Sequence, residues 1–278
     1  MSELSAESIR QAMDTVWLGQ HVHFYASLGS TNDEARQLAE AGAPEGALVI
    51  ADFQSAGRGR LARQWWSPPG SSLLMSLLFR PAFLAPHQAQ RLTMITSLAL
   101  CDAIAQVTGL SAAVKWPNDV LMQGKKVCGL LAELGVVGSR LDYVVLGMGI
   151  NVNVDFAAAD APALMAAATS LKIETDREVS RLALLTALLR RIELRYRRLQ
   201  AGVLPHAEWQ ARLITLGQEV RVTMTGHVLA GVAVGVDADG ALLVRQVDGR
   251  TQRVLAGDVT LRQDRPAGEP NAGDGGIC

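Results

Sequence analysis

The chain has 278 residues, which is enough for one large domain and a smaller one. Hydrophobic residues make up 49% of it and charged residues 19%, as in an ordinary globular protein. The net charge is −1, so no overall field draws the chain to nucleic acid or to a membrane surface, and any positive field must be local.

Cysteine usage and the N-terminal sequence indicate a cytoplasmic protein. Three cysteines without metal-ligand spacing or a disulfide framework suit a reducing compartment: Cys101, Cys128 and Cys278. The first residues have neither the basic start nor the apolar run of a signal peptide. No apolar stretch is long enough to span a bilayer, so we expect no membrane partner.

Residues 1–23 are predicted to form an N-terminal extension with one short helix over residues 5–14. The stretch before Phe24 has no room for a helix-turn-helix domain, because that domain needs at least two packed helices and a turn. The polar run at residues 30–34 then predicts the start of a second helix, capped by Ser30 or Thr31 and with acidic residues in its first turn.

Residues 24–215 are predicted to form one domain of helices and strands. Apolar runs predict buried strands over residues 47–53, 73–79, 114–116, 126–134 and 143–150. Helical spacing of apolar residues predicts helices over residues 88–107, 178–200 and 205–212. The alanine-rich stretch 156–168, which Pro162 interrupts, is predicted to be weakly ordered.

The residue pattern changes at Leu216. Short alternating runs predict strands over residues 219–224, 229–236, 241–246 and 251–255, and Asp-Gly pairs between them predict hairpin turns. We therefore expect a small β-barrel or sandwich over residues 216–262. The tail, residues 263–278, is rich in Gly, Pro and Asp and is expected to be disordered.

A basic loop at residues 54–70, called the arginine loop below, separates two of the predicted strands. Its arginines, Arg58, Arg60 and Arg63, can donate forked hydrogen bonds to phosphate or carboxylate, and its glycines let backbone N–H groups approach a ligand. A solvated loop or a nucleic-acid-binding loop would also explain one isolated Arg-Gly-Arg. The segment from Trp65 to Gly70 should fold back on the core, which disfavours both interpretations.

Three further motifs carry polar or small residues beside predicted strands. Asn118 and Asp119 form a polar pair where a metal ion or a nucleotide could sit, although an ordinary turn also fits. Lys125 and Lys126 precede a buried strand; one is expected in solvent and the other inside, where a charge without a fixed protein partner would need an anionic ligand. The Gly-x-Gly at 147–149 predicts a ligand lying against a strand.

Taken in this order, these segments resemble biotin protein ligases over about residues 24–262. The resemblance implies an α/β (α+β) fold, with a mixed sheet flanked by helices as in class II aminoacyl-tRNA synthetases and a C-terminal SH3-like β-barrel. It implies the monofunctional form, without a DNA-binding domain. The matching segments are Ser30–Asn32, Gln54 with Gly57–Arg63, Trp65–Gly70, Lys115–Asp119, Lys126 with Gly129 and Glu133, and Gly147–Asn151.

The resemblance also implies a two-step ligase reaction. Biotin and ATP would form biotinyl-5′-AMP with the help of Mg²⁺, and biotin would then pass to a specific lysine of a biotin carboxyl carrier domain of acetyl-CoA carboxylase or a related carboxylase. The expected partners include no nucleic acid and no membrane, and the protein is expected to be a monomer or a homodimer. Because an anion attacks a polyanion in the first step, cations are needed to offset the repulsion.

Individual residues take roles by this resemblance. Lys126, Arg58 and Arg60 would be catalytic, with Lys126 bridging the biotin carboxylate and the α-phosphate. Biotin would contact these three and Ser30, Thr31, Asn32, Gln54, Gly59, Gly129, Leu131, Gly147 and Gly149. ATP would contact Arg63, Trp65, Lys115, Asn118, Asp119 and Asn151, with Asp119 as a candidate Mg²⁺ ligand.

One departure and two alternatives qualify the resemblance. Ala62 stands where the family loop often has glycine, and alanine tolerates positive φ poorly, so we expect the closed loop to differ slightly. A lipoate ligase or octanoyl transferase would share the fold, but its Gly-rich and His-containing signatures are absent from residues 54–63. An RNA-binding module would need a basic face, which the net charge of −1 disfavours.

Overall fold

The computed structural model describes residues 4–159, 166–224, 227–255 and 257–261. Its larger part is built on one mixed sheet with the strand order β1-β2-β3-β7-β6-β5-β4, in which only β1 and β2 are parallel neighbours. The strands are β1 (Val22–Tyr25), β2 (Leu48–Ala51), β3 (Ser72–Phe79), β4 (Ala113–Lys115), β5 (Asp119–Met122), β6 (Lys125–Val137) and β7 (Arg140–Asn151).

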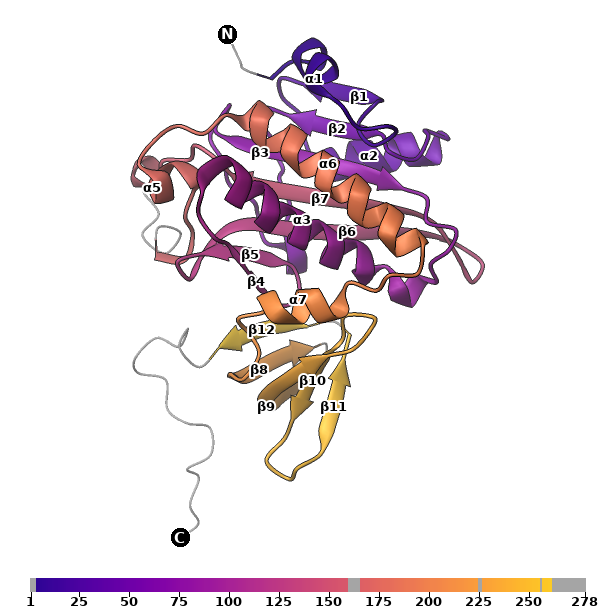
Figure 1. Cartoon of the computed structure of the whole chain (residues 1–278), viewed down its shortest axis with the longest axis vertical. Coiled ribbons are helices and arrows are strands. Elements are labelled where there is room, and N and C mark those ends of the chain that lie inside the picture. The colour runs from indigo at the N-terminus through magenta and orange to yellow at the C-terminus, as the bar shows by residue number, and fades with distance from the viewer. Residues whose placement is uncertain (1–3, 160–165, 225–226, 256, 262–278) are drawn as a thin grey trace.

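Helices cover both faces of this sheet, because its central strands are apolar on both sides. Alternate residues of β2 belong to two separate cores: Leu48 and Ile50 pack under α3 (Gln90–Thr108) and α6 (Arg181–Gln200), whereas Val49 packs under α2 (Thr31–Glu40). All of β3 is buried. Figure 1 shows α3 and α6 crossing the sheet side by side, with α1 (Ala6–Ala12) beside β1.

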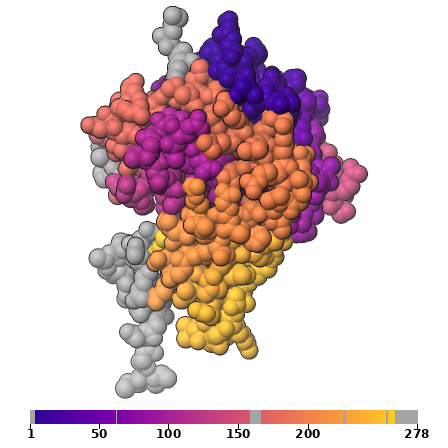
Figure 2. Space-filling view, in the orientation of Figure 1, coloured from indigo at the N-terminus to yellow at the C-terminus, as the bar shows by residue number. Residues whose placement is uncertain are grey.

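The second part is a five-stranded antiparallel sheet with the order β11-β10-β9-β8-β12, called the barrel below. It follows α7 (His206–Arg212) and lies below the large sheet in Figure 1. In the space-filling view the orange part of the surface adjoins the yellow part that belongs to the barrel (Figure 2). Its strands are β8 (Glu219–Met224), β9 (His227–Val236), β10 (Leu242–Arg245), β11 (Thr251–Val254) and β12 (Asp258–Leu261).

Buried contacts fasten the barrel to the large sheet. The indole N–H of Trp116 donates to the Gly240 carbonyl at 2.9 Å, and the Trp116 backbone N–H donates to the Thr215 hydroxyl at 3.0 Å. Arg91 of α3 pairs with Asp239 at 2.9 Å. These contacts join the turn that precedes β5 to the barrel, so the two parts meet beside the residues that the sequence singled out.

The predicted fold class is confirmed, and so are the long helices and most strands. Three strands were not predicted: β1, β5 and β12. Two short helical segments, α5 (Leu171–Thr175) and a 3₁₀ turn at Phe156–Ala159, flank a gap in the description. Residues 160–165 of the alanine-rich stretch and the tail from residue 262 lie outside the described residues. None of the described helices has the length and apolar character needed to cross a membrane.

Candidate active site

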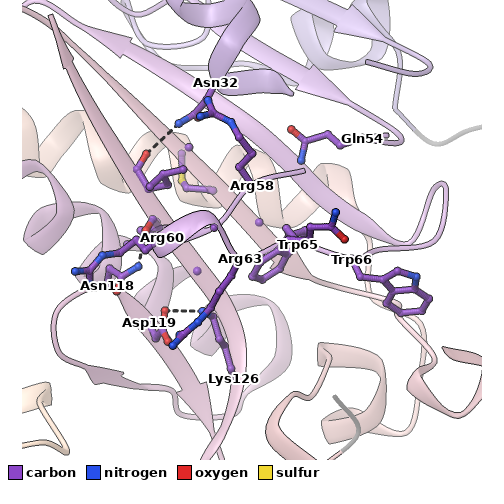
Figure 3. A pocket seen from close by; sticks show the side chains of 18 of the residues that line it. Asn32, Gln54, Arg58, Arg60, Arg63, Trp65, Trp66, Asn118, Asp119 and Lys126 are labelled. Atoms are coloured by element: carbon purple, nitrogen blue, oxygen red, sulfur yellow. Dashed lines mark hydrogen bonds and ion pairs between the residues drawn. The ribbon is translucent and has the colours of Figure 1, made fainter. Parts of the chain in front are cut away.

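A cavity opens between the arginine loop, the N-terminus of α2 and the strands β5, β6 and β7 (Figure 3). Among the site residues predicted from the sequence, only Lys115, on β4, is not part of its lining. The others all line it: Ser30, Thr31, Asn32, Gln54, Arg58, Gly59, Arg60, Arg63, Trp65, Asn118, Asp119, Lys126, Gly129, Leu131, Gly147, Gly149 and Asn151.

Sequence reasoning missed several lining residues, some of which come from distant segments. Trp66 and Phe156 lie at the cavity with ring centroids 6.2 Å apart, and Asp258 reaches it from the barrel. Gln64, Leu130, Met148 and Ala168 complete the lining. The adjacent tryptophans could have signalled Trp66, but no local pattern marks Asp258, because only the docking of the barrel brings it here.

The N-terminus of α2 is closed by Gln54, not by the predicted cap. Ser30 occupies the N-cap position but makes no side-chain cap hydrogen bond. The Gln54 Oε1 atom accepts hydrogen bonds from the Thr31 backbone N–H at 2.7 Å and from its hydroxyl at 3.0 Å. The side chain of Gln54 thus provides the cap of α2 that Ser30 or Thr31 was expected to provide. This contact holds α2 and the arginine loop together at the cavity.

Gly147 and Gly149 make room for protein side chains. A Cβ at Gly147 would lie 2.1 Å from Asn32 Oδ1, and a Cβ at Gly149 would lie 2.5 Å from the Trp65 ring. Asn32 is buried, donates to Glu133 at 2.8 Å and accepts from Ser76 at 2.6 Å. Both glycines also line the cavity, so the expectation that a ligand lies against this strand stays a prediction, with Asn32 and Trp65 as its neighbours there.

Lys126 lines the cavity, whereas Lys125 is exposed and does not. Lys126 Nζ lies 2.7 Å from Asp119 Oδ1 and 5.6 Å from the centroid of the Trp65 ring (Figure 3). The lysine expected inside therefore has a protein partner, and its charge does not by itself require an anionic ligand. The β5–β6 hairpin brings Asp119 beside it, and the carboxylate offsets the cost of a half-buried ammonium group.

The arginine loop closes on itself around a short 3₁₀ turn at Arg60–Ala62. The Gly59 N–H donates to the Arg63 carbonyl at 2.7 Å. Within this turn the positive φ, 54°, falls on Leu61. Ala62 itself has no positive φ in this conformation, and the backbone strain lies one residue earlier.

Apart from Asp119 Oδ1, which lies beside the Lys126 ammonium, two buried polar atoms at the cavity have no hydrogen-bond partner among the described residues: the indole N–H of Trp65 and Oδ1 of Asn151. Asn151 is 3% exposed, and its Nδ2 donates to the Thr169 carbonyl at 3.1 Å. A buried donor or acceptor without a partner is costly, so each can be satisfied by a bound ligand. The cavity therefore offers one donor and one acceptor in addition to its cations.

The thiol nearest this cluster is unsuited to nucleophilic chemistry. Cys128 is fully buried on β6, and burial raises the pKa of its thiol far above the usual range. The described residues also hold no group of three His, Cys, Asp or Glu side chains that could bind a metal ion. The arginines and the lysine of the lining can bind anions and stabilise their charge.

The two-part fold and the cation-lined cavity define a member of the biotin and lipoate protein ligases. The sequence model described as Biotin/lipoate A/B protein ligase family matches residues 25–151, and that of the Biotin protein ligase C terminal domain matches residues 215–262. The chain is 34% identical to Bifunctional ligase/repressor BirA of Bacillus subtilis, over 93% of this chain and 79% of that protein. It is 37% identical to a biotin–acetyl-CoA-carboxylase ligase of Paracoccus denitrificans, over 81% and 94% of the two chains. The chain belongs to the biotin protein ligase family.

Solved structures agree with this assignment. The biotin protein ligase of Aquifex aeolicus in complex with biotin and ATP superposes with a TM-score of 0.75 at 28% identity, over 87% of this chain and 99% of that chain. A mutant of the same enzyme, in complex with biotin, superposes with a TM-score of 0.72 at 27% identity, over 88% and 99% of the two chains. Both likenesses extend through the large sheet and the barrel.

Proposed function

We propose that this chain activates biotin with ATP and transfers it to a lysine of a biotin carboxyl carrier domain. The observation that carries the proposal is the cavity in which Lys126, Arg60 and two unpartnered polar atoms converge, in a chain of this family. Relatives named as ligases of acetyl-CoA carboxylase support a carboxylase as the acceptor.

The first step is the formation of biotinyl-5′-AMP. An oxygen of the biotin carboxylate attacks the α-phosphorus, a new P–O bond forms, and the bond to the β-phosphate breaks to release pyrophosphate. Lys126 and Arg60 offset the repulsion between carboxylate and triphosphate and hold the charge that builds up in the transition state. The ion pair with Asp119 holds the Lys126 ammonium at the cavity, so this cation is positioned before the substrates arrive.

The second step needs no nucleophile from this chain. The amine of the acceptor lysine attacks the acyl carbon of the mixed anhydride, an amide bond forms, the bond to phosphate breaks, and AMP leaves while the amine loses a proton. Until then the reactive anhydride has to be kept from water. The arginine loop, with Trp65 and Trp66, lies over the cavity where it can do so.

Mg²⁺ fits this site as an ion that would bind together with the ATP phosphates. The described residues provide no cage of three acidic side chains, so the protein alone offers few ligands. The unpartnered Oδ1 of Asn151 and the carboxylate of Asp119 are oxygen atoms of the lining that would hold this ion. When bound, the ion would neutralise charge on the phosphates.

Mass spectrometry of candidate carrier domains tests this function. We expect a biotin adduct on one lysine after incubation with the protein, ATP, Mg²⁺ and biotin, and none when ATP is omitted. A lipoate adduct in place of the biotin adduct would assign the chain to the other branch of the family. No adduct on any biotin carboxyl carrier domain, together with no biotinyl-5′-AMP, would overturn the proposal.

A further inference from the structure

The three arginines of the arginine loop are held by different kinds of partner. Arg58 pairs with Asp33 at 2.7 Å and Glu133 at 3.2 Å, and Arg63 pairs with Asp258. Both oxygen atoms that Arg60 contacts in the described part of the chain are neutral. Its Nη1 donates to Asn118 Oδ1 at 3.0 Å, and its Nη2 donates to the Gly257 carbonyl at 2.9 Å.

Neutral acceptors orient a guanidinium without cancelling its charge. A carboxylate in contact would offset that charge, as it does for the other two arginines. Arg60 is half-buried, and burial lowers the pKa of its guanidinium while leaving it protonated at neutral pH. Of the three arginines, Arg60 is thus the one whose hydrogen bonds go to neutral oxygens, although the charges of Asp258 and Asp119 act on it from nearby.

Both polar atoms of the Asn118 side chain, and its backbone carbonyl, contact other parts of the protein. Its Nδ2 donates to the Leu130 carbonyl at 2.6 Å, and its own carbonyl accepts from the Leu130 N–H at 2.9 Å. Its remaining group, Oδ1, accepts from Arg60, and Figure 3 shows the two side chains joined at one end of the cavity. Asn118 thus ties Arg60 to β6, and its side-chain hydrogen bonds in the described part of the chain go to the protein itself.

The second acceptor comes from the barrel at a closely packed point. A Cβ at Gly257 would lie 2.6 Å from the Val222 side chain and 3.1 Å from the Thr223 carbonyl, so its backbone runs tightly against β8. The Gly257 carbonyl is therefore held as firmly as the barrel itself. Two separate parts of the fold fix the direction of one guanidinium.

We propose that Asn118 and the Gly257 carbonyl are positioning groups for Arg60, and that Asn118 acts on the nucleotide only through this arginine. The proposal rests on the proposed function and changes the expected role of Asn118, from a contact of ATP to a holder of the cation that contacts it. The barrel thereby completes the active site of the large sheet.

A double-mutant cycle in biotin-dependent ATP–pyrophosphate exchange tests this inference. We compare the native protein with Asn118→Ala, Arg60→Ala and the double variant. Asn118→Ala should lower kcat/KM for ATP by about tenfold or more, because the arginine loses its orientation. In the Arg60→Ala background, Asn118→Ala should cause almost no further loss, because the group through which it acts is gone.

Losses that multiply in the double variant would overturn the inference, since Asn118 would then contact the nucleotide independently. Native-like exchange by either single variant would overturn it as well. If Asn118→Ala does not fold, as judged by urea unfolding, the cycle is run with Asn118→Asp. That variant places a carboxylate on Arg60 and should raise KM for ATP only while the arginine is present. Absence of exchange in the native protein would instead refute the proposed function.

Discussion

At the residue scale, Lys126 and Asp119 show what a sequence can and cannot reveal. The resemblance to biotin protein ligases selects Lys126 over Lys125, and of the two only Lys126 lines the cavity. Its pairing with Asp119 could not be predicted, because it depends on the register of a hairpin whose first strand, β5, looks like a turn in the sequence. Gln54 at the start of α2 is a similar case, since a local cap was predicted and a distant side chain supplies the contact.

Lys126→Ala should abolish adenylate formation, because it removes the cation placed between the two anionic substrates. We expect biotin-dependent pyrophosphate exchange to fall by about 100-fold or more. Lys125→Ala is the matched control, since that side chain is exposed, and its exchange rate should stay within about twofold of native. Equal losses in the two variants would show that the bridging cation has been assigned to the wrong residue.

Gly147→Ala should destabilise the fold, because the added Cβ would lie 2.1 Å from Asn32 Oδ1. We expect the free energy of unfolding in urea to fall by about 1–3 kcal/mol, as for other overpacked sites. Gly29→Ala is the control, because a Cβ there meets nothing within 4 Å. The close packing of Gly147 would be refuted if both variants unfolded at the native urea concentration.

At the scale of elements, periodicity predicted α3 and α6 to within a few residues, because their apolar positions repeat regularly around a buried helix. The strands that were not predicted from the sequence are short and contain residues typical of turns or polar residues. β1 contains His23 and lies at the sheet edge, and β12 begins at Asp258 directly after a glycine. Their pairing with β2 and β8 is a tertiary effect that no local pattern records.

The chain around residues 16–18 is held to α6 by one buried carboxylate. Glu193, 5% exposed, accepts from the backbone N–H groups of Val16, Trp17 and Leu18 at 3.0–3.1 Å. Glu193→Ala should lower the free energy of unfolding by about 2–3 kcal/mol and speed hydrogen exchange at these amides. Glu178→Ala, at an exposed side chain, should cost less than about 0.5 kcal/mol. Unchanged amide exchange in Glu193→Ala would contradict this role.

The helix before the barrel, α7, is tied to α6 through Glu208 and Arg195, 2.7 Å apart. The hydrogen bond from Arg195 holds the pKa of the Glu208 carboxyl below its usual range. A carboxyl group whose pKa is lower in the folded than in the unfolded state stabilises the fold at pH values above its unfolded-state pKa. This contribution is lost as the pH falls through the folded-state pKa. Glu208→Gln should therefore be less stable than native at pH 7, by under about 1 kcal/mol because the pair is partly exposed.

The difference in unfolding free energy between Glu208→Gln and native protein should shrink as the pH falls below about 4, where the carboxyl is protonated in both states. Urea unfolding at several pH values measures it. A difference that stays constant down to about pH 3, or that grows with acid, would mean that the charge of Glu208 is not the stabilising feature.

At the scale of the whole molecule, three contacts join the barrel and the large sheet, and one of them involves a residue of the cavity lining. Trp116 reaches Gly240, Arg91 reaches Asp239, and Arg60 reaches Gly257. We therefore expect both parts to unfold in one transition in urea. Tryptophan fluorescence reports on the large sheet, since all five tryptophans precede the barrel, and amide exchange of β8–β12 reports on the barrel. Two separate transitions would show that these contacts do not couple the parts.

Biotin-dependent ATP–pyrophosphate exchange tests the central claim most directly, because it measures the first chemical step without a carrier domain. With Mg²⁺ present, we predict exchange that requires biotin, is not supported by lipoate, and is lost in Lys126→Ala. Exchange supported by lipoate but not by biotin, or no exchange with either acid in a folded protein, would contradict the assignment of this cavity to biotin activation.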